Sequence, residues 1–124
     1  MSEAFDGTAG LKSLRREMAA IRALRSSHHA RRNPVTRWIA ETFHNKDKIE
    51  TFCDDAVDAV AGVIIAFYSQ PVNIRPETVS RLEAFDQRLR LAFGAATVGE
   101  ADKIEASRIE AALLKTKEIA QAAS

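Results

Sequence analysis

The feature that most constrains the fold is an apolar run of ten residues, Ala59–Tyr68, which carries no charge. Upstream of this run, apolar residues recur at steps of three and four, as on one face of a helix. They are Ile49, Phe52, Cys53, Ala56, Val57 and Val60. We therefore predict one helix over residues 48–69. Because a helix that is apolar all round must be buried on every side, we expect the rest of the chain to pack around its end.

Four further helices are predicted on either side of this one, at residues 9–30, 34–44, 76–93 and 98–121. Apolar residues recur at helical spacing in each segment. Asn33-Pro34 is typical of an N-cap followed by proline at the first helical position. The segments Asp47–Glu50 and Thr97–Glu100 have the spacing of a capping box. No segment shows the sustained alternation of a strand, so the predicted fold class is all-α.

The length of 124 residues suits one domain. We predict a flexible N-terminus at residues 1–7 and a single helical domain at residues 8–124, a bundle of about five helices with a buried central helix. A helix of 22 residues is about 33 Å long, which exceeds the diameter expected for such a domain. Its length, and the apolar stripe of the first helix, favour a homo-oligomer.

The cellular compartment is predicted from three features. The single cysteine, Cys53, cannot form an internal disulfide, which fits a reducing compartment. The acidic N-terminus lacks the pattern of a secretory signal. The apolar run is far shorter than the roughly 20 residues that span a bilayer. We therefore expect a cytoplasmic protein that makes no contact with a membrane.

Charge is distributed unevenly along the chain. Between Lys12 and Arg37 there are eight basic residues and one acidic residue, whereas residues 38–124 hold ten basic and fourteen acidic residues. Arginine makes bidentate contacts to carboxylates and phosphates. The segment therefore suggests a partner-binding surface, or else only a solvated face. Its candidate residues are Arg15, Arg16, Arg22, Arg25, Arg31, Arg32 and Arg37.

Two kinds of partner fit a basic surface of this kind. The first is an acidic protein surface, which would make the chain a non-enzymatic interaction or regulatory protein of the adaptor or inhibitor type. The alternative is nucleic acid, because neutralising backbone phosphates drives non-specific binding. No aromatic residue lies among residues 11–37, which argues against a platform on which single-stranded bases stack.

A third hypothesis rests on the acidic start of the predicted helix 48–69. Asp54-Asp-Ala-Val-Asp58 spells DDxxD, which resembles the magnesium-binding motif of isoprenoid synthases over these five residues. The resemblance implies a magnesium-dependent enzyme that uses Glu50, Asp54, Asp55 and Asp58. The structural alternative is a solvated stripe near a helix N-terminus, where acidic side chains are favoured.

Other residues that often carry chemistry form no recognisable site in the sequence. His28 and His29 are adjacent, so their side chains point about 100° apart on a helix, and a transition-metal site needs three or four convergent ligands. Cys53 lies on an apolar face, and Trp38 is typical of a core or interface anchor. We therefore assign no catalytic residue, no metal ligand and no cofactor from the sequence.

Overall fold

The computed structural model describes residues 7–43, 47–69, 76–95 and 98–122, and this part of the chain is helical throughout apart from short connections. The helices are α1 (Gly7–Ala30), α2 (Pro34–Phe43), α3 (Lys48–Ser69), α4 (Pro76–Phe93) and α5 (Glu100–Ala122). The all-α prediction is therefore confirmed, and both ends of each predicted helix lie within two residues of the ends observed. Gly7, which we expected in a flexible N-terminus, is the first residue of α1; residues 1–6 lie outside the described residues.

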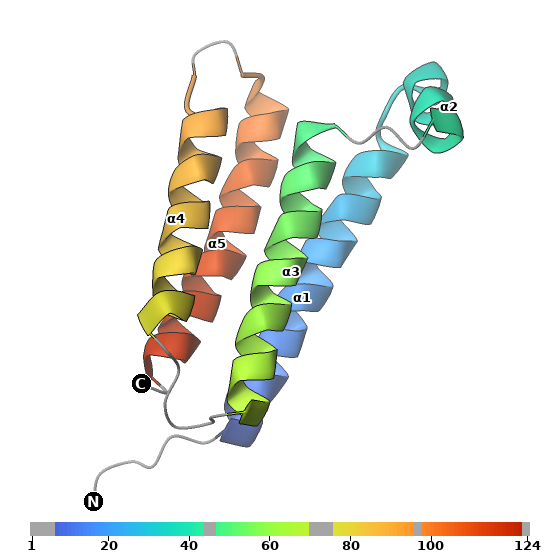
Figure 1. Ribbon diagram of the computed structural model, residues 1–124. Coiled ribbons are helices and arrows are strands. Elements are labelled where there is room, and N and C mark those ends of the chain that lie inside the picture. Colours follow the sequence, from blue (N-terminus) through green and yellow to red (C-terminus); the bar gives the residue numbers. More distant parts are fainter. Residues whose placement is uncertain (1–6, 44–46, 70–75, 96–97, 123–124) are drawn as a thin grey trace, which may run out of the picture.

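Four of the helices run side by side and α2 stands apart from them (Figure 1). The bundle is held by contacts of α1 with α3 and α5, of α4 with α5, and of α3 with both α4 and α5. The short α2 lies at the end of the bundle where α1 finishes and where α3 and α5 begin. This end therefore brings together segments that lie far apart in the sequence.

The core is built from the apolar stripes of all four long helices. On α1, Leu14, Ile21 and Leu24 are buried, so the stripe of the first helix docks onto its own domain. The rings of Phe52 and Phe85 meet edge to face with centroids 5.7 Å apart, an arrangement that adds to the gain from burial. The buried apolar residues of α3, α4 and α5 include Val60, Val63, Phe67, Leu82, Leu89, Phe93, Ile109 and Leu113.

The end of α3 differs from the expectation that it is buried on every side. Val63 and Phe67 are buried, but Ile65 and Tyr68 are each 64% exposed. That expectation is wrong for this face, because the neighbours of α3, which are α1, α4 and α5, leave one side of the helix open. The Tyr68 hydroxyl accepts a hydrogen bond of 2.5 Å from Arg15, which gives its polar end a partner at the surface.

Two of the predicted helix starts are observed with their capping bonds. The backbone N–H of Glu50 donates to Asp47 Oδ1 at 2.8 Å, and that of Asp47 reaches Glu50 Oε1 at 3.5 Å, which is the reciprocal pattern of a capping box. The backbone N–H of Val35 donates to Asn33 Oδ1 at 2.9 Å. Thr97 and the segment 70–75 lie outside the described residues.

Among the described helices, none combines the length and apolar character needed to cross a membrane.

Candidate functional site

The end of the bundle beside α2 carries a cluster of charged side chains from three helices. Basic residues come from the end of α1 and the turn after it, and acidic residues come from the starts of α3 and α5. The C-terminus of a helix favours positive charge and its N-terminus favours negative charge. At this end of the bundle, the signs of the charges therefore match the polarity of three helix ends that meet. We call this group the polar end cluster: Arg25, His28, His29, Arg31, Arg32, Asp47, Glu50, Asp54, Asp102 and Glu105.

Glu50 is the centre of one half of the polar end cluster. It is 2% exposed and forms an ion pair with the guanidinium of Arg32. Arg25 lies 3.7 Å from Glu50 Oε2 and pairs with Asp54 at 2.7 Å, while Nδ1 of His29 lies 3.3 Å from Glu50 Oε2. Because a buried carboxylate is costly unless it is paired, Arg25 and Arg32 make the burial of Glu50 possible.

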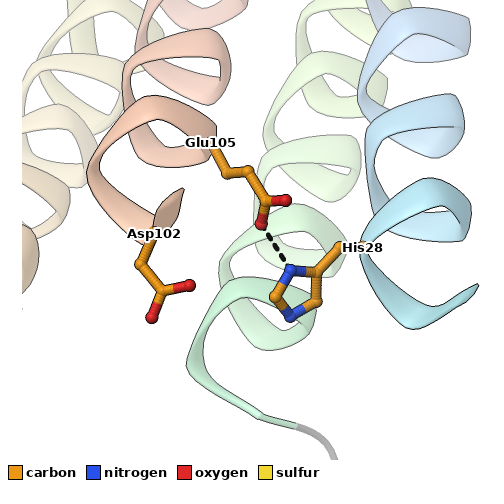
Figure 2. A group of neighbouring side chains, drawn as sticks. All are labelled: His28, Asp102 and Glu105. Carbon is orange, nitrogen blue, oxygen red and sulfur yellow. Dashed lines mark hydrogen bonds and ion pairs between the residues drawn. The ribbon is translucent and has the colours of Figure 1, made fainter. Parts of the chain in front are cut away.

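His28 and Glu105 form the other half, where α1 meets α5 (Figure 2). The Nδ1 atom of His28 contacts Glu105 Oε2, and its Nε2 atom lies 2.5 Å from Asp47 Oδ2. The second oxygen of Glu105 pairs with Arg31. Asp102, one turn before Glu105, extends its carboxylate toward the same point. The ring of His28 thus lies between the carboxylate of Asp47, just before α3, and that of Glu105 on α5.

The electrostatics of this end shift two pKa values away from their ordinary range. Burial alone would raise the pKa of Asp47, but the hydrogen bonds from the Glu50 backbone and from His28 outweigh it, so this pKa is lowered. Burial would likewise lower the pKa of Arg25, but its bond and charge interaction with Asp54 prevail and the pKa is raised. Both groups are held in their charged forms.

The structure distributes the seven arginines of the predicted binding surface among different environments. Arg25, Arg31 and Arg32 pair with carboxylates of the same chain. Arg15 bonds to Tyr68, and Arg37 donates to the backbone oxygen of Ala30 at 3.3 Å. Arg16 and Arg22 are exposed, and no carboxylate among the described residues pairs with them. The seven side chains therefore do not gather into one free basic face.

The acidic stripe of α3 is divided as well. Glu50 and Asp54 turn toward α1 and its arginines, whereas Asp55 and Asp58 line a cavity of about 490 Å³ between α3 and α4. Arg81 and Arg88 line the same cavity, and its apolar wall includes Phe85. The four carboxylates of the magnesium hypothesis therefore do not converge on one point.

The second feature of this end is α2. Unlike a core helix, it contacts the bundle through polar side chains and exposes apolar ones. Two of its polar side chains contact α1: Arg37 bonds to the backbone oxygen of Ala30, and Glu41 lies 3.0 Å from Nε2 of His29. Its large apolar side chains face solvent, whereas the small Ala40 is buried, and we call the large ones the α2 apolar face. They are Val35 (66% exposed), Trp38 (62%), Ile39 (39%) and Phe43 (65%). The residues at positions 35, 39 and 43 recur every four residues, so they share one side of the helix.

Sequence reasoning found part of this site. It identified the arginines and the Asp47–Glu50 cap, but it did not find Glu105 as a partner of His28, 77 positions away, or Asp102 as a neighbour of both. The one sequence signal that pointed to such partners was the excess of acidic residues after residue 37.

Comparison of the chain with protein-family models, with curated proteins and with solved structures finds no match.

Proposed function

We propose that this chain is a non-enzymatic helical interaction protein that binds a partner protein through the α2 apolar face. The observation that carries the proposal is the attachment of α2 by its polar side, with Arg37 and Glu41 bound to α1 and Trp38 and Phe43 left in solvent. An apolar face held outward in this way is typical of a surface that a partner covers. The role is of the adaptor or inhibitor type.

The partner we propose is a protein with an apolar groove. A helix of ten residues is about 15 Å long, and apolar anchors at steps of three and four are the pattern that a groove receives. Two such convex faces in contact would bury far less than the roughly 800 Å² per partner of a stable interface. A second copy bound through α2 alone is therefore disfavoured, and light scattering on the full chain tests the predicted homo-oligomer.

The arginine segment takes a smaller part in this proposal than in the sequence-based hypothesis. Three of its seven guanidinium groups are used inside the polar end cluster, and the exposed Arg16 and Arg22 remain available to an acidic rim of the partner. The nucleic-acid alternative needs the same side chains, and only those that are free would contribute to phosphate contacts.

The test is capture from a lysate of the source organism, treated with nuclease, using the wild type and two variants. Trp38→Ala/Phe43→Ser removes the anchors of the α2 apolar face. Ile65→Ser is the matched control, because Ile65 is equally exposed but lies on α3. We expect the wild type and the control to capture a partner that the double variant does not capture. Adding the purified partner should then quench or shift the fluorescence emission of Trp38.

Two results would contradict the proposal. One is a partner retained by the double variant, which would place the interface elsewhere on the chain. The other is capture that disappears with nuclease treatment, which would favour the nucleic-acid alternative. Circular dichroism of each variant shows whether a lost interaction reflects a lost fold.

A further inference from the structure

We propose that His28, Asp102 and Glu105 bind a divalent transition-metal ion of the zinc class where the end of α1 meets the first turns of α5. Each residue offers one ligand atom, and these three atoms lie within 4.8 Å of one another. In Figure 2 the imidazole and both carboxylates point toward a common region between the two helices. Zinc sits roughly 2.0–2.2 Å from nitrogen and oxygen ligands, so the direct contact between His28 and Glu105 has to open to admit the ion while the Asp102 carboxylate moves in.

The two ring nitrogens of His28 supply the first argument. Each nitrogen faces a carboxylate, Nδ1 toward Glu105 and Nε2 toward Asp47. A neutral imidazole carries a single N–H and can donate to only one of them. The other nitrogen then directs a lone pair at a carboxylate oxygen, and this contact needs a positive charge between the two atoms. A metal ion bound to both atoms supplies that charge.

The outer partners of the ligands supply the second argument. A histidine that binds a metal almost always donates its other ring N–H to a carboxylate or carbonyl, which fixes the ring. Asp47 is placed to accept that bond from Nε2 at 2.5 Å. Arg31 holds the oxygen of Glu105 that does not face His28. Both inner ligands are thus anchored through the atom that the metal would not use.

Burial and ligand type indicate the class of ion. Glu105 is 4% exposed, His28 is mostly buried, and the exposed Asp102 leaves a route to solvent and a position for water. One imidazole with two carboxylates is a ligand set that suits zinc, whereas magnesium prefers oxygen ligands and retains several waters. Bound there, the ion would join α1 to α5 beside the attachment of α2.

The experiment is calorimetric titration of the full chain with zinc, with cobalt absorption spectra as a second readout of the ligands. We expect one ion per chain. Asp47→Asn should weaken binding about 10–100-fold, as for other outer partners, and His28→Gln and Asp102→Asn by at least as much. His29→Gln is the matched control, because this neighbouring histidine also lies against carboxylates, and it should leave the affinity unchanged. Magnesium should not compete.

Asp102→Asn keeps the proposal falsifiable if His28→Gln fails to fold, because Asp102 is exposed. The proposal is overturned if zinc and cobalt show no saturable binding up to the millimolar range. It is also overturned if Asp102→Asn binds as tightly as the wild type, or if His29→Gln removes the binding. Sulfur-to-cobalt charge-transfer absorption would overturn it as well, because it would place the ion on Cys53.

Discussion

Arg32 and Glu50 form an ion pair that joins the turn after α1 to the first turn of α3, with side chains only 13% and 3% exposed. Glu50 also bonds to the cap of its own helix and lies near Arg25 and His29. One carboxylate therefore connects the end of α1 to the start of α3. The stability of this end of the bundle should depend on it.

Replacing Glu50 with leucine should destabilise the fold strongly. The change leaves Arg32 buried without its partner, and breaking a buried pair from one side costs about 3–5 kcal/mol. Urea unfolding followed by circular dichroism measures the loss. Glu41→Gln is the control, because Glu41 is 61% exposed and its pair with His29 should contribute less than about 1 kcal/mol. Equal losses in the two variants would contradict the central position of Glu50.

The single tryptophan should report a solvent-exposed site in the folded protein. Trp38 is 62% exposed, so its emission should shift little on unfolding, and acrylamide should quench it nearly as well in the native state as in urea. Trp38→Ala should change the unfolding free energy by less than about 0.5 kcal/mol, whereas Ile21→Ala in the core should cost about 2–5 kcal/mol. A strongly blue-shifted native emission would show that α2 is covered in solution.

The lowered pKa of Asp47 gives a pH dependence with a defined sign. Because this pKa is lower in the folded chain than in the unfolded chain, the folded state binds fewer protons between the two values, and stability rises with pH there. The stabilisation is present above the ordinary value of 3.8 and is lost as pH falls through the folded value. Wild type should therefore exceed Asp47→Asn in stability at neutral pH.

Urea midpoints from pH 7 down to about pH 3 measure this difference. The gap between wild type and Asp47→Asn should stay constant at neutral pH and narrow below about pH 4. A gap of the same size at every pH would mean that the variant acts through packing and not through the charge of Asp47.

Cys53 should be inert toward thiol reagents in the folded protein. Burial, with a further contribution from Asp54, raises the pKa of its thiol to about 11, so only roughly one thiol in a thousand is ionised at pH 8. Its side chain is also fully buried. The reaction with an aromatic disulfide reagent should be slow in buffer and fast in denaturant. Similar rates in both conditions would show that α3 opens readily.

Two glycines should respond to alanine in opposite directions. A Cβ at Gly62, inside α3, meets no atom within 4 Å, so Gly62→Ala should stabilise the fold by about 0.5–1 kcal/mol through the helix preference of alanine. A Cβ at Gly94, just after α4, would lie 2.7 Å from the backbone oxygen of Arg90. Gly94→Ala should therefore lower the thermal midpoint, and a rise would contradict the close approach seen at this helix end.

The helices could be predicted from the sequence, and the candidate site only in part. Apolar steps of three and four, the Asn33-Pro34 start and the Asp47–Glu50 cap are signals that act within a few residues, so the bounds of α3 agree at both ends. The same signals placed apolar residues at helical spacing in the segment 34–44, which forms α2. They did not show whether those residues would be covered, because coverage depends on helices that lie elsewhere in the chain.

The sequence by itself determined the helical class, the starts of α2, α3 and α4 and the separation of positive from negative charge, since each follows from the local chemistry of the chain. Only the tertiary structure decided which charges neutralise one another and which apolar faces stay in solvent. Side chains as far apart in sequence as His28 and Glu105 become neighbours only when α1 and α5 pack together. That packing joins Arg25, Arg31 and Arg32 to carboxylates of the same chain and leaves the α2 apolar face exposed to solvent.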